Sequence, residues 1–396
     1  MIYDFDKVID RKYTDSMKWD LKNVKAPMWV ADMDFQVAPA IQQAISNRLY
    51  PQVYGYTLIP PAFYTSIQKW WLERHGIQFE REMMQYVTGV LPALNAMIQR
   101  FTQPGDHIVI MTPGYHMFRH IIENMGRVCI ENPLLYVNGS YIIDFNELDH
   151  QLADKKTSMM IVCNPHNPTG NLWDRLDLEH IGNVCQKHHV LVVSDEIHCD
   201  IVQPGYTYVP YAKASETCWN NSITLVSCTK AFNVAGLSSA CVIIPNPALC
   251  KQAKIALEQA LITGNGFFNA QVSIAAFENS GDWLDAMNAY VAENKKIVTE
   301  FIRESISELR VVESLATYLL WIDCSQLVEN TDGLCKLLLE KDGLFLSKGS
   351  DFGKNGQAFF RMNVALPRQQ LLENLLLLRS GLHTRTMRRY IEEYDR

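Results

Sequence analysis

From about residue 86 to residue 246 the chain alternates short apolar runs with amphipathic stretches of helical length. The apolar runs read "DHIVIMTP", "TSMMIVCNP", "HVLVVSDE", "SITLVSCTK" and "SSACVIIPN", and the intervening stretches include "LPALNAMIQRF" and "DLEHIGNVCQKHH". Continuous apolar runs separated by helices predict a mostly parallel central sheet that helices cover on both faces. The last run follows its neighbour too closely for a helical crossover, so we expect those two strands to pair antiparallel. The sequence therefore predicts an α/β fold.

A second, smaller domain is expected from the two ends of the chain. The stretch "DWLDAMNAYVAENKKIVTEFIRESISEL" has a long helical pattern and would link two domains. Short strands and helices follow it, among them "LATYLLWIDC" and "GQAFFRMNVAL". We expect a large domain over residues 46–285 and a small α+β domain made of residues 1–45 and 286–396.

Composition excludes several classes of protein. The net charge is −7 and there is no basic surplus, which argues against a nucleic-acid partner. No apolar stretch reaches membrane-spanning length, and the start "MIYDFDKVIDRK" lacks the pattern of a signal peptide. None of the ten cysteines stands in a C-x-x-C spacing, so we expect no metal site and a reducing, cytoplasmic environment.

Three predicted strands end in polar groups. One is followed by "NPHNPTG" (164–170), one ends in "SDEIH" with Asp195, and one ends at Ser227 with Lys230 one turn on. The Asn-Pro pairs of the first motif predict a turn that leaves amide side chains pointing outward. In an open parallel sheet, ligands lie beyond the carboxyl ends of the strands. We expect the acid and the lysine, which follow separate strands, to converge on one crevice.

An aldehyde cofactor would reconcile these residues. Lys230 would bind it as a Schiff base, Asp195 would pair with its protonated ring nitrogen, and Asn167 would contact the ring hydroxyl, as in pyridoxal phosphate enzymes. Each residue also has a simpler interpretation. Lys230 fits a surface lysine with a buried stem, Asp195 fits a helix N-cap, and the Asn-Pro pairs fit plain turns. All three together, in this order, favour the cofactor.

The order of these motifs resembles the fold-type I, aspartate-aminotransferase-like superfamily of pyridoxal phosphate enzymes. The stretches "DFDKVIDRKYTDSMKWD", "MWVADMDF", "YGYT" and "FFRMNVALPR" are similar to those of its cystathionine β-lyase (C–S lyase) branch. The resemblance implies that Lys230 holds the cofactor and moves protons, that Asp195 keeps the ring nitrogen protonated, and that Asn167 contacts the ring oxygen. His198 stands where many relatives have a tyrosine, and this fits the lyase branch. Tyr115 would stack on the ring; without the family it reads as a core tyrosine.

The resemblance also implies a phosphate site, a substrate-binding arginine and a partner. Backbone N–H groups of Gly89, Val90 and Leu91, in a Gly turn that leads into a helix, would bind the phosphate together with the Ser227 hydroxyl. Tyr56 would reach the phosphate of a neighbouring subunit, which implies a homodimer with shared active sites. Arg361 would grip the substrate carboxylate, although alone it reads as a strand arginine. Ser238 stands where many relatives have a phosphate-binding arginine, which leaves the phosphate charge to backbone and hydroxyl groups.

The resemblance favours a C–S β-lyase that converts L-cystathionine or related cysteine S-conjugates to pyruvate, ammonia and a thiol. The alternative is an aminotransferase that acts on an L-amino acid and a 2-oxo acid, because both reactions use the same residues. A regulatory protein that only binds the cofactor would show damage at Lys230, Asp195, Asn167 or Arg361, and none is present. A nicotinamide-dependent dehydrogenase is not indicated, since no G-x-G-x-x-G follows a strand.

Overall fold

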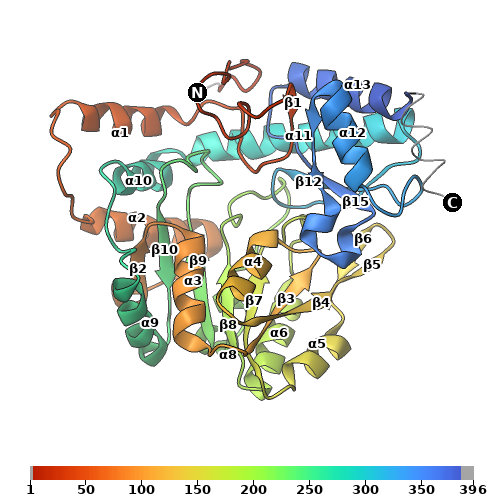
Figure 1. Cartoon of the computed structure of the whole chain (residues 1–396). Coiled ribbons are helices and arrows are strands. Elements are labelled where there is room, and N and C mark those ends of the chain that lie inside the picture. The colour runs from red at the N-terminus through yellow and green to blue at the C-terminus, as the bar shows by residue number, and fades with distance from the viewer. Residues whose placement is uncertain (1–2, 385–396) are drawn as a thin grey trace.

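A computed structural model describes residues 3–384 and shows a seven-stranded sheet at its centre (Figure 1). Within these residues, β10 alone runs antiparallel to its neighbours, and the other six strands are parallel to one another. The mostly parallel sheet and the antiparallel pairing of "SSACVIIPN" with the strand before Lys230 are thus confirmed. In spatial order the strands are β2 (Met84–Val87), β10 (Ala240–Ile243), β9 (Ser222–Val226), β8 (Leu191–Asp195), β7 (Thr157–Cys163), β3 (His107–Thr112) and β4 (Val128–Pro133).

Both faces of the large sheet are buried under helices, which explains the continuous apolar runs in its central strands. In β3, Ile108 and Ile110 face one hydrophobic cluster, while Val109 and Met111 face another. The first cluster lies under α3 (Val90–Phe101), α4 (His116–Asn124) and α9 (Pro247–Gln259). The second lies under α5 (Phe145–Leu152), α6 (Arg175–Lys187), α7 (Tyr211–Ala214) and α8 (Glu216–Asn220).

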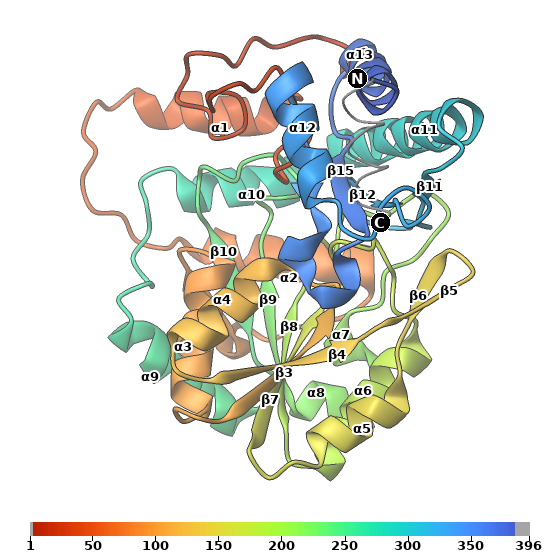
Figure 2. The ribbon, with the colours of Figure 1, turned by 45° about the vertical axis from the view of Figure 1, so that its right-hand side comes forward.

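A smaller four-stranded sheet is built from the C-terminal third of the chain. Figure 2 shows it above the large sheet, and its strands are β11 (Arg310–Val311), β12 (Leu319–Asp323), β15 (Phe359–Asn363) and β14 (Ser347–Lys348). The N-terminal segment joins this region, because β1 (Ala26–Pro27) pairs in parallel with β13 (Leu344–Phe345). This pairing accords with a small domain formed by both chain ends.

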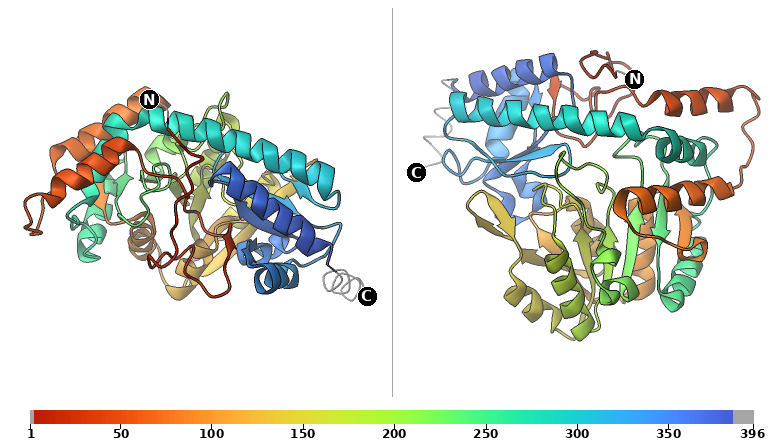
Figure 3. Two further views of the ribbon diagram at one scale, coloured as in Figure 1. Left: turned by 90° about the horizontal axis from the view of Figure 1, so that it is seen from above. Right: turned by 180° about the vertical axis from the view of Figure 1, so that it is seen from behind.

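The predicted long helix is α11 (Gly281–Ser305), which runs alongside α13 (Arg368–Leu382) in Figure 3. The domain boundaries themselves stay a prediction, and residues 385–396 of the expected small domain lie outside the described part. The remaining elements are α1 (Pro39–Leu49), α2 (Pro61–His75), α10 (Asn269–Asn279), α12 (Asp332–Asp342), β5 (Leu135–Val137), β6 (Ser140–Ile142) and the 3₁₀ turns at Arg81–Met83, Gly349–Phe352 and Lys354–Gly356.

All ten cysteines fall within the described residues, where they are free thiols, and nine of them are buried. They behave as small core residues. Over residues 3–384, no helix combines the length and the apolarity that crossing a bilayer would require.

Candidate active site

Lys230 lies in the turn that follows β9, and its amine points at the N-terminal segment. The Nζ atom donates a hydrogen bond to the carbonyl oxygen of Ala31, 2.8 Å away. Burial lowers the pKa of the amine to about 8, and the nearby Arg361 guanidinium lowers it further, whereas the Asp32 and Asp195 carboxylates oppose the shift. An amine with a pKa of about 8 is neutral in about a tenth of the molecules at pH 7, far more than an ordinary lysine, and a neutral amine is both a nucleophile and a base.

Asp195 closes strand β8 beside the end of β7, where the register pairs it with Cys163. Its side chain is buried, and it accepts a hydrogen bond from the N–H of Ile197 at 3.1 Å. Burial is the main reason that its pKa rises to about 7, and the Lys230 ammonium partly offsets this rise. A buried carboxylate with few donors favours a cationic partner, because its charge is otherwise poorly compensated.

The loop after β7 carries two buried asparagines with different roles. Asn164 turns away from the crevice and donates to the carbonyl of Val209 at 2.9 Å. The expectation that the loop leaves its amides pointing outward is therefore wrong, since both asparagines are buried and Asn164 serves the loop itself. Asn167 faces the small sheet, where its Oδ1 accepts a hydrogen bond from Nη1 of Arg361 at 3.0 Å.

Arg361 lies at the centre of β15, so the small sheet delivers it to the carboxyl ends of the large sheet. Its Nη2 atom also donates to the carbonyl of Trp29 at 2.8 Å, and its guanidinium lies 4.9 Å from the centre of the Phe352 ring. Burial lowers its pKa to about 10, which still leaves it charged at neutral pH. Among residues 3–384, no carboxylate forms an ion pair with it within 4.0 Å, so its charge is free to bind an incoming carboxylate.

His198 and Tyr115 lie near the same charged groups. His198 is buried, and burial together with the Lys230 and Arg361 charges lowers its pKa to about 3, so the imidazole is neutral. Its Nδ1 atom is buried without a hydrogen-bond partner. Tyr115 precedes α4 and lies within electrostatic reach of Arg361 and Asp195. Tyr318, which the sequence analysis missed, is fully buried near the charges of Asp32 and Arg361.

The predicted phosphate site is the N-terminus of α3. Gly89 is the residue before the helix, and Val90 and Leu91 are its first two residues, so their N–H groups have no acceptor within the helix. Ser227 lies two strands away, and its hydroxyl already donates to the carbonyl of Ser239 at 2.6 Å. That hydroxyl could serve a phosphate only by rotating away from Ser239, and its role stays a prediction.

Tyr56 lies apart from the other predicted site residues. It belongs to the segment between α1 and α2, which extends to the left edge of Figure 1, and its side chain is fully exposed. This exposure is what we expect of a residue that acts in a neighbouring subunit, but the described chain does not test that role.

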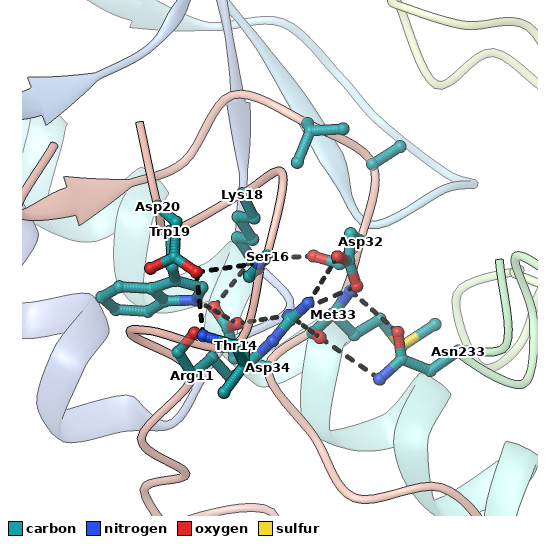
Figure 4. Close-up of polar contacts among 12 residues, drawn as sticks. Arg11, Thr14, Ser16, Lys18, Trp19, Asp20, Asp32, Met33, Asp34 and Asn233 are labelled. Atoms are coloured by element: carbon teal, nitrogen blue, oxygen red, sulfur yellow. Dashed lines mark hydrogen bonds and ion pairs between the residues drawn. The ribbon is translucent and has the colours of Figure 1, made fainter. Parts of the chain in front are cut away.

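Figure 4 shows a polar network in the N-terminal segment, to which the sequence analysis assigned no role. The same segment accepts the Lys230 hydrogen bond at Ala31. Arg11 forms ion pairs with Asp32 at 2.7 Å and with Asp34 at 2.9 Å, and the buried Lys18 lies 2.7 Å from Asp34. Asn233, three residues after Lys230, bonds the backbone of this segment. The signal was present in the quoted stretches "DFDKVIDRKYTDSMKWD" and "MWVADMDF", but nothing in their spacing shows that they fold onto the lysine.

A second cluster of titratable groups lies outside the site. The ligand-type atoms of His75, Cys199 and Asp200 lie within 4.8 Å of one another. Oδ1 of Asp200 is already 2.9 Å from both Nε2 of His75 and the indole nitrogen of Trp70, so these side chains satisfy one another. We assign no metal to the cluster, and the expectation of no metal site stays a prediction.

The residues of the crevice fit pyridoxal phosphate. A lysine with a lowered pKa, a buried carboxylate short of donors and a neutral histidine with an unpartnered nitrogen lie together. The first two are the groups that such a cofactor requires at its aldehyde and its ring nitrogen. A helix N-terminus at the edge of the same sheet suits its phosphate.

Comparison with known proteins gives the family. Residues 31–376 match the model for aminotransferase class I and II. The chain is 34% identical to cystathionine beta-lyase PatB of Bacillus subtilis over 384 residues, covering 96% of this chain and 99% of PatB. It is 30% identical to the protein MalY of Escherichia coli over 382 residues, covering 93% and 96% of the two chains.

Among solved structures, cystalysin from Treponema denticola, which contains a pyridoxal 5'-phosphate cofactor, aligns with a TM-score of 0.93 at 31% identity and covers 96% of this chain and 99% of its own. The resemblance inferred from the motifs and the predicted fold class are thereby confirmed. The chain belongs to the class I and II aminotransferase family.

Proposed function

We propose that the protein is a pyridoxal-phosphate-dependent C–S β-lyase that converts L-cystathionine or related cysteine S-conjugates to pyruvate, ammonia and a thiol. The observation that carries the proposal is the convergence of Lys230, Asp195 and Arg361 at one end of the sheet. The full-length likeness to a cystathionine β-lyase supports the lyase over a transaminase, because the site residues themselves serve both reactions.

Each cofactor-binding residue has a distinct position. Lys230 would hold the aldehyde carbon, Asp195 would keep the ring nitrogen protonated, and Asn167 and His198 would contact the ring oxygen. Tyr115 would pack on the ring face. When bound, the cofactor withdraws electrons from the substrate Cα, which makes the Cα proton removable.

The N–H groups of Gly89, Val90 and Leu91 at the α3 N-terminus would bind the phosphate, with the Ser227 hydroxyl and with Tyr56 from a second copy of the chain. The full exposure of Tyr56 supports a homodimer. The buried free thiols support a cytoplasmic location.

In the elimination, Arg361 and Lys230 have different roles. Arg361 binds the α-carboxylate with a planar fork of donors and orients the Cα–H bond. The Lys230 amine, when it is not linked to the cofactor, would take the Cα proton as general base, and its lowered pKa suits that role. The electron pair left by the Cα proton would form the Cα–Cβ double bond as the Cβ–S bond breaks and the thiolate leaves. Water would then hydrolyse the resulting 2-aminoacrylate to pyruvate and ammonia.

The test is to incubate the purified enzyme with L-cystathionine and to assay pyruvate and free thiol without any added 2-oxo acid. We expect equal amounts of both products. We also expect Lys230→Ala to abolish turnover, because it removes both the cofactor linkage and the base. Turnover that depends strictly on a 2-oxo acid would instead identify an aminotransferase, the alternative that the family allows.

A further inference from the structure

The segment from Trp29 to Asp32 lies between Lys230 and strand β15. Lys230 donates to the carbonyl of Ala31 from one side at 2.8 Å. From the other side, Nδ2 of Asn363 donates to the carbonyls of Val30 at 2.7 Å and Asp32 at 2.8 Å. The backbone next to the reactive amine is therefore fixed on both sides.

Asn233 fixes the following residues to the turn that carries Lys230. Its Oδ1 accepts from the N–H of Met33 at 3.0 Å, and its Nδ2 donates to the carbonyls of Met33 at 3.2 Å and Phe35 at 2.8 Å. Three hydrogen bonds from one side chain hold this stretch in register with the lysine. Asp32 therefore lies between Ala31, which Lys230 contacts, and Met33, which Asn233 contacts.

The charges of this network balance in pairs. Two carboxylates, Asp32 and Asp34, face two cations, Arg11 and Lys18. Lys18 and Arg11 both contact Asp34, whereas Arg11 is the one cation among residues 3–384 that pairs with the Asp32 side chain, which is 27% exposed. Loss of Asp32 would leave one surplus positive charge near Lys230, and loss of Arg11 would leave one surplus negative charge.

We propose that Asp32 is a positioning residue that controls how firmly the Lys230 nitrogen holds its proton, and that Arg11 limits this effect. The proposal rests on the proposed function, since it concerns Lys230 when that residue is joined to pyridoxal phosphate. The charged or titratable groups that face the Lys230 nitrogen are Asp32, Arg361, Asp195 and His198.

The balance of effects on Lys230 agrees with this assignment. After burial, which lowers the pKa of Lys230, the Asp32 carboxylate has the largest effect and raises it. Arg361 acts in the lowering direction and Asp195 in the raising direction, each less strongly than Asp32. Asp32 therefore affects the pKa of this amine more than Asp195 does, the carboxylate that would pair with the cofactor ring.

The test is a pH titration of the visible absorbance of the holoenzyme, which reports protonation of the nitrogen that joins Lys230 to the cofactor. Asp32→Asn removes a negative charge and should lower the midpoint by about one pH unit. Arg11→Met should raise the midpoint, because it leaves the Asp32 charge uncompensated. Arg11→Lys keeps the charge and should stay close to wild type.

Asp15→Asn is the matched control, because Asp15 is an exposed carboxylate of the same segment. We expect its midpoint to equal that of the wild type. A merely structural role for Asp32 would not move the two charge variants in opposite directions. An unchanged midpoint in Asp32→Asn, or a lowered midpoint in Arg11→Met, would overturn the proposal. If Asp32→Asn does not fold, the midpoint of Arg11→Met decides.

The same preparations separate this inference from the function on which it rests. If the wild type makes no pyruvate from L-cystathionine but the two variants shift in opposite directions, the lyase assignment fails and the role of Asp32 stands. If the wild type makes pyruvate and the midpoints do not move, the role of Asp32 fails and the lyase assignment stands.

Discussion

At the scale of single residues, the site works because burial and charge act on a few groups in opposite directions. Burial drives the pKa of Lys230 down to about 8 and that of Asp195 up to about 7, so the charged forms of both are disfavoured. A bound ring with a cationic nitrogen would relieve Asp195, since an opposite charge stabilises a carboxylate. Without the cofactor, burial makes the charged forms of both side chains unfavourable, and a bound cofactor would offset this cost at Asp195 by charge pairing.

The lowered pKa of Lys230 should be visible in its reactivity without cofactor. An amine reacts with acylating or arylating reagents only when it is neutral, so the labelling rate follows its deprotonation. In the ligand-free protein we expect labelling of Lys230, followed by peptide mass spectrometry, to rise with a midpoint near pH 8 rather than near the ordinary 10.5. The exposed Lys69 offers an internal comparison in the same samples. A Lys230 midpoint no lower than that of Lys69 would contradict the burial argument.

Arg361 should affect substrate binding more than the chemical step. Arg361→Ala removes the guanidinium that pairs with the substrate carboxylate, and we expect KM for L-cystathionine to rise about 100-fold, or roughly 3 kcal/mol. Arg361→Lys keeps the charge but loses the planar fork, so we expect an intermediate KM. Steady-state kinetics of the two variants would check this, and an unchanged KM in the alanine variant would exclude Arg361 from the carboxylate site.

At the scale of elements, residues 314–316 hold the loop after β7 in place. The carbonyl of Gly170 accepts hydrogen bonds from the N–H groups of Leu315 and Ala316, both at 3.0 Å. The buried Lys295 of α11 donates to the carbonyls of Ser314 and Ala316 in that same segment. This arrangement connects α11 to the loop that presents Asn167 to Arg361.

Gly170 is the position of this loop that should tolerate substitution least. Its φ is 76°, and a Cβ there would lie 2.1 Å from Oγ of Ser314. We expect Gly170→Ala to lower the free energy of unfolding by about 3 kcal/mol, from left-handed strain plus the clash. Gly139→Ala is the control, since its φ is 88° but nothing lies within 4 Å of the added carbon, so strain of about 1 kcal/mol is all it should cost. Equal losses in denaturant unfolding would show that the clash is relieved by movement of Ser314.

At the scale of the whole molecule, the exposed segment between α1 and α2 is the feature that the single chain leaves unexplained. Tyr50, Tyr54, Tyr56 and Leu58 all expose most of their side chains there. A run of exposed large side chains indicates an interaction surface. The proposed homodimer would cover this segment and bring Tyr56 to the phosphate of the other subunit.

Shared active sites predict complementation between two inactive variants. Tyr56→Ala should impair cofactor binding in the partner's site, and Lys230→Ala should abolish catalysis in its own. Mixed dimers would contain one site with both residues intact, so refolding the two variants together should restore part of the pyruvate-forming activity that neither shows alone. Mixing that restores nothing, although mass analysis shows mixed dimers, would place Tyr56 outside the partner's site.

The sequence by itself determined the fold class, and it predicts the main site residues. Apolar strands that are buried on both faces leave a continuous pattern, and polar residues at their carboxyl ends meet at one edge, so Lys230 and Asp195 can be expected close together. The roles of these residues and of Asn167 come from the resemblance to the family. Only the tertiary structure decided which groups surround them. Arg11, Asp32, Asn233 and Tyr318 come from segments far apart in the chain, and contacts of that kind leave no periodic signal in the sequence. The pKa shifts likewise depend on burial, which is set by how the small sheet and the N-terminal segment pack over the large sheet.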